Sequence, residues 1–215
     1  MFMSNLSAFL FDLDGTLIDS TELIMESFRH TMRTHLGLVP SDAEWRAGFG
    51  TPLEPQLARY ARSPEELTSM ATTYRAHNDE HHDRLVKPYV GIHNVIDELT
   101  DRGSRMCIVT SKNRKLTKRG LRHCALERFF DVLVTADDVT EHKPRPAPVL
   151  EALSRLDADA DQAVLIGDSP HDCMAGQAAG VLTAVALWGP FTRESLEPHG
   201  PDHWLEQPRE ILQLV

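Results

Sequence analysis

Residues 7–17 read Ser-Ala-Phe-Leu-Phe-Asp-Leu-Asp-Gly-Thr-Leu. The first half is an apolar run dense in phenylalanine and leucine, which is typical of a buried strand. The run ends at an Asp-Gly-Thr turn, so Asp12 and Asp14 are expected at the carboxyl end of that strand. Two carboxylates two positions apart, with Gly15 following, indicate a turn whose oxygens could bind a hard cation.

Four similar apolar runs follow along the chain, and helical patterns separate them. The runs are Arg105–Thr110, Asp131–Thr135, Ala163–Gly167 and Leu182–Leu187, and the helical patterns are Ile92–Asp101, Arg114–His123, Ala147–Leu156 and Asp172–Ala179. Strands that alternate with helices form parallel sheets that are covered on both faces. The sequence therefore predicts an α/β fold, with a Rossmann-like parallel sheet at the core and helices on both of its faces.

The chain between the first two strands is much longer than a crossover requires. Asp12 and Thr110 are 98 positions apart, whereas a crossover between parallel strands needs about a dozen residues and its turns. The interval shows only amphipathic helical patterns, at Ser20–His35, Asp42–Ala47, Leu53–Tyr60 and Pro64–Leu85. We expect an all-helical cap at residues 17–86, inserted into a core made of residues 1–16 and 87–215.

Polar side chains follow three of the predicted strands: Asp12 and Asp14, then Thr110 and Ser111, then Asp168. In open parallel sheets, ligands bind at the carboxyl ends of the strands. Carboxylates at a turn can bind a hard cation, and hydroxyl and N–H groups at the start of a helix can hold phosphate oxygens. Each pair alone also fits an ordinary turn or helix cap. Their convergence at one sheet edge is what predicts a site.

A fixed positive charge is available from Lys143, which stands in a loop with Pro144, Pro146 and Pro148. The restricted backbone of proline stiffens such a loop. Phosphoryl transfer requires a nucleophile, a metal ion, donors for the phosphate oxygens and an acid for the leaving group. The residues at the strand ends, together with this lysine, supply each of these groups.

Two segments resemble known motifs: Phe11-Asp12-Leu13-Asp14-Gly15-Thr16-Leu17 and Ile166-Gly167-Asp168-Ser169-Pro170-His171-Asp172 are similar to the first and last motifs of the haloacid dehalogenase superfamily. Thr110 and Lys143 match its two middle motifs, and the order and spacing agree over essentially the whole chain. The resemblance implies a magnesium-dependent phosphatase that works through a phosphoaspartate.

The resemblance also implies a role for each residue. Asp12 would be the nucleophile and Asp14 the general acid and base, while Thr110 would hold the phosphoryl group and Lys143 would neutralise it and orient Asp12. Magnesium would be bound by the Asp12 carboxylate, the main-chain oxygen of Asp14 and the Asp168 carboxylate. An alkoxide leaving group needs a proton and a halide does not, so Asp14 favours phosphate chemistry over dehalogenation.

Further residues are implied around this centre. Asp172 looks like the second acidic position of the family and would orient a metal-bound water. The segment Gly48–Pro52 resembles a cap loop that is lowered onto the substrate, although a Gly-Pro turn between helices explains it equally well. The expected substrate-contacting residues are Gly15, Thr16, Ser111, Gly50 and Thr51.

Several functions remain open at this stage. The leading substrate class is a small phosphomonoester like phosphoglycolate. The alternative is inorganic pyrophosphate, because Asn78–Asp83 is similar to a segment of bacterial pyrophosphate-hydrolysing relatives, although a solvated helix face explains it as well. A phosphomutase like β-phosphoglucomutase shares the four motifs. A phospho-accepting signalling module is the non-enzymatic alternative, and the inserted cap argues against it because a receiver must expose its site.

Charge and composition narrow the partners. A formal net charge of −10 would repel a phosphate backbone, so we expect no nucleic-acid partner. The basic stretch from Lys112 to Arg122 could draw anions to the site or be a solvated helix face. The opening residues predict neither a signal peptide nor a membrane span, so a cytoplasmic monomer or homodimer without a membrane partner is expected. Adjacent His81 and His82 point apart on a helix and do not predict a zinc site.

Overall fold

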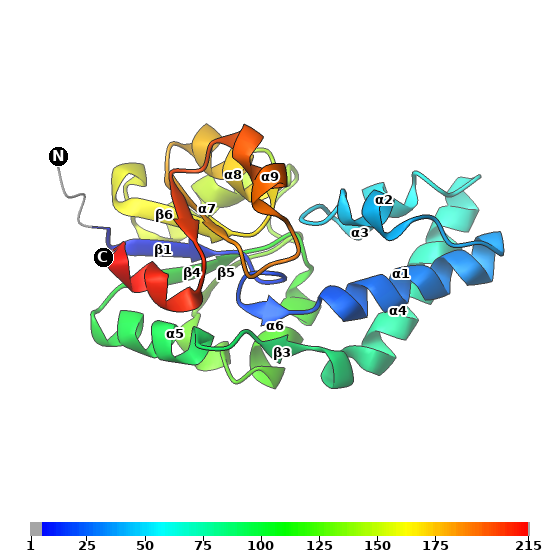
Figure 1. The fold of residues 1–215 in the computed structure, drawn as a ribbon, viewed down its shortest axis with the longest axis horizontal. Coiled ribbons are helices and arrows are strands. Elements are labelled where there is room, and N and C mark those ends of the chain that lie inside the picture. The colour runs from blue at the N-terminus through cyan, green and yellow to red at the C-terminus, as the bar shows by residue number, and fades with distance from the viewer. Residues whose placement is uncertain (1–5, 215) are drawn as a thin grey trace.

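A six-stranded sheet forms the centre of the molecule, with strand order β5-β4-β1-β6-β7-β8 (Figure 1). In this computed structural model, which describes residues 6–214, every neighbouring pair of these strands is parallel. The strands are β1 (Ala8–Phe11), β4 (Arg105–Val109), β5 (Val132–Val134), β6 (Ala163–Gly167), β7 (Leu182–Ala186) and β8 (His203–Leu205). The predicted α/β fold is therefore confirmed. Residues 1–5 and 215 of the expected core range lie outside the described residues.

Helices cover both faces of the sheet, as the sequence predicts. Every residue of β1 is fully buried. Phe9 and Phe11 pack with α5 (Ile92–Asp101) and α6 (Arg114–His123), whereas Ala8 and Leu10 pack with α7 (Ala147–Leu156) and α8 (Pro170–Ala179). Successive side chains of β1 therefore point to opposite faces of the sheet and contribute to the apolar cluster on each face. The remaining short helices are α9 (Arg193–Leu196), η1 (Glu127–Phe129), η2 (Ala160–Gln162), η3 (Glu197–His199) and η4 (Pro208–Gln213).

The segment between residues 19 and 87 contains four helices that lie beyond the carboxyl ends of the strands (Figure 1). They are α1 (Thr21–Leu36), α2 (Asp42–Arg46), α3 (Leu53–Leu57) and α4 (Pro64–Leu85), and α1 packs along α4. This insert has its own apolar cluster, in which the rings of Phe28 and Trp45 stack with centroids 4.1 Å apart. The chain passes between the core and the insert twice, and the antiparallel strands β2 (Ile18–Asp19) and β3 (Lys87–Pro88) pair with each other at these two passages.

The structure adds elements that the sequence patterns did not predict. Strands β2, β3 and β8 span two or three residues, too few to show an alternation. Helix α8 begins at Pro170, two residues earlier than expected, because Ser169 and Asp172 form a reciprocal capping box around its first turn. Among the helices described, none has the length and apolarity needed to span a bilayer.

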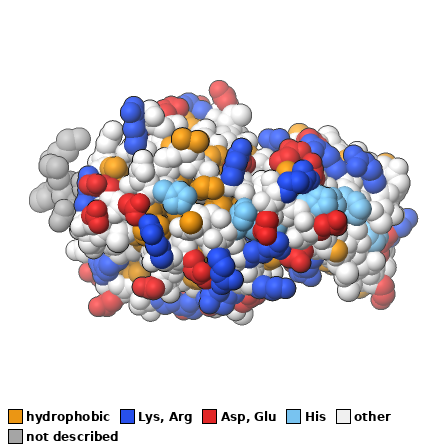
Figure 2. All heavy atoms as spheres, turned by 90° about the horizontal axis from the view of Figure 1, so that it is seen from below, with side chains coloured by type: hydrophobic (Ala, Val, Ile, Leu, Met, Phe, Trp, Pro, Cys, Tyr) orange, Lys and Arg blue, Asp and Glu red, His pale blue; other side chains and the backbone are white. Residues whose placement is uncertain are grey.

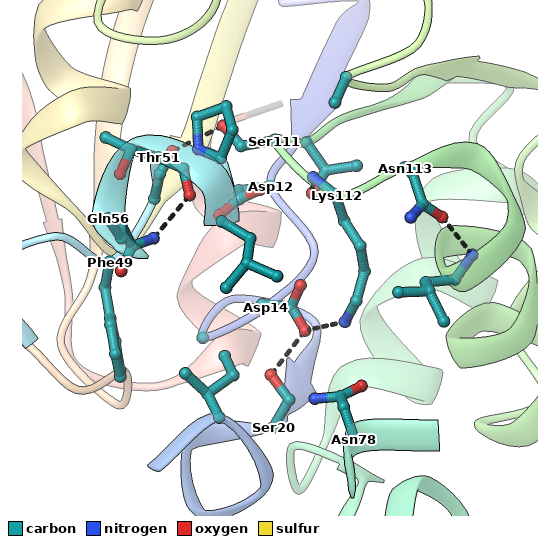
Figure 3. Close-up of a pocket in the computed structure, with 18 of the residues that line it drawn as sticks. Asp12, Asp14, Ser20, Phe49, Thr51, Gln56, Asn78, Ser111, Lys112 and Asn113 are labelled. Atoms are coloured by element: carbon teal, nitrogen blue, oxygen red, sulfur yellow. Dashed lines mark hydrogen bonds and ion pairs between the residues drawn. The ribbon is translucent and has the colours of Figure 1, made fainter. Parts of the chain in front are cut away.

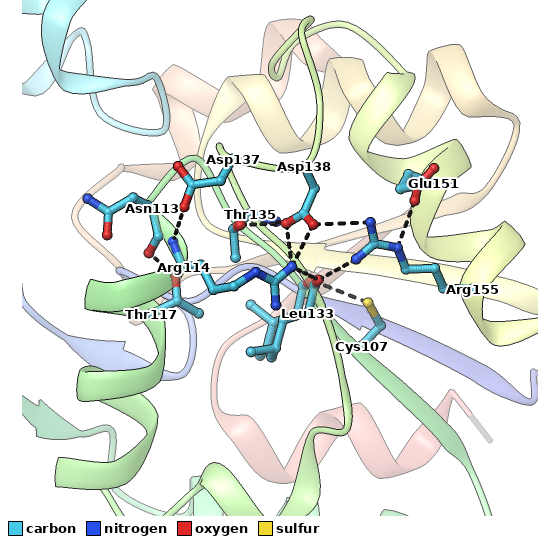
Figure 4. A network of polar contacts seen from close by, with 11 residues as sticks. Cys107, Asn113, Arg114, Thr117, Leu133, Thr135, Asp137, Asp138, Glu151 and Arg155 are labelled. Atoms are coloured by element: carbon cyan, nitrogen blue, oxygen red, sulfur yellow. Dashed lines mark hydrogen bonds and ion pairs between the residues drawn. The ribbon is translucent and has the colours of Figure 1, made fainter.

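A partly buried ionic network holds the loop after β5 in place (Figure 4). The Asp138 carboxylate accepts hydrogen bonds from Arg114 Nη2 at 2.5 and 2.7 Å, from Arg155 Nη2 at 3.1 Å and from the Thr135 hydroxyl at 2.5 Å. Partial burial of Asp138 opposes ionisation, but the Thr135 and arginine hydrogen bonds dominate and hold its pKa well below the ordinary range. The network thereby links α6 and α7 to a loop that reaches the site.

Candidate active site

The predicted residues meet at one end of the sheet. A cavity of about 320 Å³ lies between the strand ends and the insert, and it is lined by Asp12, Asp14, Thr110, Ser111 and Asp168 together with residues of α1–α4 (Figure 3). Because parallel strands present their carboxyl ends at the same edge, side chains from β1, β4 and β6 converge there. Lys143, from the loop before α7, reaches this site through its contact with Asp12.

The buried ammonium of Lys143 is the polar centre of the site. Its Nζ lies 3.0 Å from Asp12 Oδ1 and 2.6 Å from Asp172 Oδ1, and it donates a hydrogen bond to the main-chain oxygen of Val109 at 3.1 Å. Burial disfavours the charge, but Asp12 and Asp172 outweigh it and hold the pKa of Lys143 above its usual range. This lysine is therefore a fixed positive charge beside the Asp12 carboxylate.

The carboxylates of Asp12, Asp168 and Asp172 are buried and their oxygens lie within 4.8 Å of one another. Burial raises the pKa of Asp12 to about 7 against the opposing pull of Lys143. Burial and the Asp12 carboxylate likewise raise the pKa of Asp168 well above its ordinary value. Three buried carboxylates thus face one ammonium, and this excess of negative charge on hard oxygen ligands fits a divalent cation such as Mg²⁺.

The backbone at Gly15 must pass very close to Asp168. A Cβ atom at Gly15 would lie 2.5 Å from Asp168 Oδ2, and the φ of +87° is one that residues with side chains rarely adopt. Thr16 donates its hydroxyl hydrogen to Asp168 Oδ1 at 3.0 Å, and its main-chain oxygen accepts from the indole N–H of Trp188 at 2.9 Å. Both residues shape the wall around the carboxylates.

Asp172 is predicted from the sequence to orient a metal-bound water, and the structure shows that its carboxylate contacts Lys143 and Ser169. Its Oδ1 pairs with Lys143, and its Oδ2 accepts hydrogen bonds from the Ser169 N–H at 3.1 Å and the Ser169 hydroxyl at 2.5 Å. A carboxylate in these contacts orients the ammonium and caps α8. Its expected contact with a metal-bound water stays a prediction.

Asp14 lies in the cavity, but its side chain turns toward the insert (Figure 3). Its Oδ1 accepts hydrogen bonds from the Ser20 hydroxyl at 2.6 Å and from Lys112 Nζ at 2.7 Å. The sequence patterns did not single out Ser20 and placed Lys112 only within a basic stretch. The position of Lys112, two residues after Thr110 at a strand end, was the signal that could have identified it.

The loop that contains Gly50 and Thr51 touches the core. Ser111 donates its hydroxyl hydrogen to the main-chain oxygen of Gly50 at 2.6 Å. A Cβ atom at Gly50 would lie 2.7 Å from Ser169 Oγ, and φ is +88° there. Thr51 is held by its hydroxyl on the Gly48 main-chain oxygen at 2.7 Å. The structure thus brings both predicted insert residues to the cavity, with the loop seated on the strand ends.

The insert contributes a wall that sequence reasoning did not identify. Several cavity-lining side chains have buried polar atoms without a hydrogen-bond partner among the described residues: Trp45 Nε1, Gln56 Oε1 and Asn78 Oδ1. Arg75 also lines the cavity and pairs with Glu54. These residues are spread over three helices, α2, α3 and α4, so neither their spacing nor their type indicated a shared site.

Most of the basic stretch after Thr110 is ion-paired. Arg114 binds Asp138 (Figure 4), Arg119 binds Asp79 and Asp83 on α4, and Arg122 binds Glu127. Of this stretch, Lys112 lines the cavity. The expected pull on anions therefore rests on Lys112, while the distal arginines join α6 to its neighbours.

Comparisons with known proteins agree with this geometry. Residues 9–186 match the family of haloacid dehalogenase-like hydrolases, and the chain belongs to that family. The resemblance inferred from the four motifs is thereby confirmed.

The chain is similar to curated relatives that carry a more specific name. A protein named pyrophosphatase PpaX from Halalkalibacterium halodurans is 38% identical over 206 residues, covering 96% of this chain and 95% of that protein. Another pyrophosphatase PpaX, from Anoxybacillus flavithermus, is 38% identical over 211 residues, covering 98% and 97%.

Solved structures show the same fold. A haloacid dehalogenase-like family hydrolase from Streptococcus pneumoniae has a TM-score of 0.83 and 27% identity, covering 97% of this chain and 98% of that one. A "putative phosphoglycolate phosphatase" from Lactobacillus plantarum has a TM-score of 0.86 and 28% identity, covering 98% and 100%. The names of these relatives include both substrate classes that the sequence leaves open: pyrophosphate in the curated relatives and phosphoglycolate in one of the solved structures.

Proposed function

We propose that this enzyme is a magnesium-dependent pyrophosphatase that works through a phosphoaspartate at Asp12. The observation that carries the proposal is the buried Asp12–Lys143–Asp172 arrangement beside Asp168, at the end of a cavity that residues of the insert help to line. The curated relatives named pyrophosphatase support pyrophosphate over the phosphoglycolate-like ester that was the leading expectation.

The residues divide the chemistry between them. Asp12 attacks phosphorus, so a carboxylate–phosphorus bond forms as the bond to the leaving phosphate oxygen breaks. Lys143 and the Thr110 hydroxyl hold the transferred phosphoryl oxygens. Asp14 gives its proton to the leaving oxygen and then takes one from the water that hydrolyses the phosphoaspartate. Free phosphate and the original Asp12 result.

A magnesium ion held by the Asp12 and Asp168 carboxylates and the main-chain oxygen of Asp14 would offset the charge of the transferred phosphoryl group. The insert and the core each contribute a cation that an anionic leaving group needs: Arg75 comes from α4, and Lys112 comes from the loop after β4. Lys112 and Arg75 both line the cavity, each beside an acidic partner from which it can turn toward phosphate. A leaving phosphate carries more negative charge than glycolate, the leaving group of 2-phosphoglycolate, so these cations support pyrophosphate.

Phosphate release tests the proposal. Purified protein is assayed with pyrophosphate and with 2-phosphoglycolate, each with and without Mg²⁺, and Asp12→Asn protein from the same preparation controls for contaminating phosphatase. We expect kcat/KM for pyrophosphate to exceed that for 2-phosphoglycolate at least tenfold, and both activities to require Mg²⁺. A reversed preference would make this a monoester phosphatase and would refute the pyrophosphatase assignment.

A further inference from the structure

A second cluster of metal-ligating side chains lies on the insert, away from the cavity. His77 and His81 are one helical turn apart on α4, and Glu26 on α1 faces them. One ligand atom from each of these three residues lies within 4.8 Å of the other two. Figure 2 shows imidazole side chains gathered on the lobe that holds the insert. Two histidines at i and i+4 on one helix are a recurrent arrangement for a transition metal.

Hydrogen bonding prepares His77 to bind a metal. The Ser27 hydroxyl donates its hydrogen to the main-chain oxygen of Leu23 at 2.8 Å. Its oxygen, 3.2 Å from His77 Nδ1, can therefore only accept a hydrogen bond from that nitrogen. The hydrogen of His77 therefore sits on Nδ1, and Nε2 keeps its lone pair. A histidine ligand whose other nitrogen donates to a fixed acceptor is the usual arrangement at metal sites.

His81 offers a nitrogen that nothing else in the described chain uses. Its Nδ1 is buried and has no hydrogen-bond partner among the described residues. The ring centroids of His77 and His81 lie 4.2 Å apart, and the rings of His30 and His77 stack with centroids 4.6 Å apart. A buried polar atom without a partner is costly, and coordination of a cation would satisfy it.

The charges around the cluster select the kind of metal. Glu26 also pairs with Arg84 at 3.2 Å. Glu26 and His77 line a hollow of about 270 Å³, and Arg29, His30 and Arg33 line the same hollow. Arg29 is engaged by Asp42 at 2.5 Å. The positive charges of Arg84, Arg29 and Arg33 repel a metal ion that would be held by electrostatic attraction alone. Imidazole ligands favour Zn²⁺, Ni²⁺ or Cu²⁺, whereas Mg²⁺ and Ca²⁺ prefer sites built from oxygen.

We propose that His77, His81 and Glu26 form a binding site for a transition-metal ion, with Zn²⁺ as the representative, that joins α1 to α4. All three side chains are partly exposed, so the ion can enter from solvent and the side chains can rotate to bond lengths of about 2.0–2.2 Å. The site is separate from the acidic centre at Asp12 and Asp168. Ser27 links it to the cavity, because Asn78 Nδ2 also donates to Ser27 Oγ at 3.5 Å.

Zinc binding to the whole protein tests this site. Protein held in excess Mg²⁺, which occupies the oxygen-ligand site, is titrated with Zn²⁺ by calorimetry, and Co²⁺ is added separately to record the visible spectrum of the bound ion. We expect one tight equivalent of Zn²⁺ and a rise in Tm. His77→Gln and His81→Gln should each weaken binding at least tenfold and remove the rise in Tm.

The controls keep the result decisive. His199→Gln removes a histidine of η3 on the core and should bind Zn²⁺ like the parent. Circular dichroism verifies that each variant is folded, and Glu26→Gln, which replaces a partly exposed residue, provides a second route if a histidine variant unfolds. Wild-type protein that binds no Zn²⁺ in the micromolar range, or binding that survives His77→Gln and His81→Gln unchanged, would overturn the proposal.

Discussion

Replacing Asp12 by asparagine should stabilise the metal-free protein and abolish its response to Mg²⁺. Burial raises the pKa of Asp12 to about 7, with Asp172 and Asp14 acting in the same direction and Lys143 against them. A carboxyl group whose pKa is raised by folding binds its proton more tightly in the folded state. Its contribution to stability is therefore lost as pH rises from 3.8, the ordinary Asp value, through about 7.

The size of this effect follows from the same values. The gap between 3.8 and about 7, at about 1.4 kcal/mol for each pKa unit, corresponds to about 4 kcal/mol above neutral pH. Asp12→Asn removes this cost but leaves Lys143 with Asp172 as its carboxylate partner. We therefore expect a net gain of about 1–3 kcal/mol, and in a chain of this length each kcal/mol raises Tm by about 2–4 °C.

Calorimetric unfolding near pH 8 measures both parts of the prediction. In EDTA, Asp12→Asn should have the higher Tm, and added Mg²⁺ should raise the Tm of the wild type only. Asp161→Asn, on the exposed η2 turn, is the control for loss of one negative charge. A lower Tm for Asp12→Asn in EDTA, together with an unchanged response to Mg²⁺, would refute the charge argument at this site.

Three further variants test separate parts of the site and its support. Lys112→Met removes a cation that lines the cavity 2.7 Å from Asp14, so the leaving phosphate loses electrostatic stabilisation and kcat for pyrophosphate should fall at least tenfold. Gly50→Ala places a methyl group 2.7 Å from Ser169 Oγ, so the loop cannot seat and kcat/KM should fall at least tenfold, measured by phosphate release. Asp138→Asn should lower the free energy of unfolding by about 1–3 kcal/mol in urea. The depressed pKa of Asp138 means that this difference is present above about pH 4 and shrinks as pH falls.

Each of these variants has a matched control. Lys115→Met changes an exposed lysine three positions after Lys112, in the first turn of α6, and should leave kcat unaltered. Gly37→Ala also has a positive φ but meets no atom within 4 Å, so it separates backbone strain from the steric clash. Asp131→Asn changes an exposed acid near β5. Equal effects in a variant and its control would contradict the corresponding prediction.

The core of the fold could be predicted because its signals are local and strong. Residues 8–11 form a strand with no exposed side chain, and its apolar run is visible in any window that contains it. The helices α5, α6 and α7 lie at the predicted bounds. Strand β8 could not be predicted in the same way, because three residues that pair with β7 at the sheet edge owe their structure to that neighbour.

The acidic centre could also be predicted, because its residues follow strands directly and the topology brings strand ends together. The wall of the insert could not. Trp45, Gln56 and Asn78 belong to three helices, and only the packing of the insert brings them to one cavity. The contact between Lys143 and Asp172 depends on a loop path that no periodicity describes. Sequence patterns therefore indicate the chemistry at the strand ends, and packing decides which side chains surround it.

The phosphoaspartate can be detected directly in Asp14→Asn protein. This variant keeps the Asp12 carboxylate and its contact with Lys143 at 3.0 Å, but it lacks the group that would activate water. An aryl phosphate, whose leaving group needs little protonation, should therefore phosphorylate Asp12 while hydrolysis slows by about 10²–10⁴-fold. Acid quenching followed by intact-protein and peptide mass spectrometry should then show one phosphoryl group on Asp12 and none in Asp12→Asn protein. A phosphoryl group on a serine, threonine or histidine, or full turnover by Asp12→Asn, would contradict the mechanism.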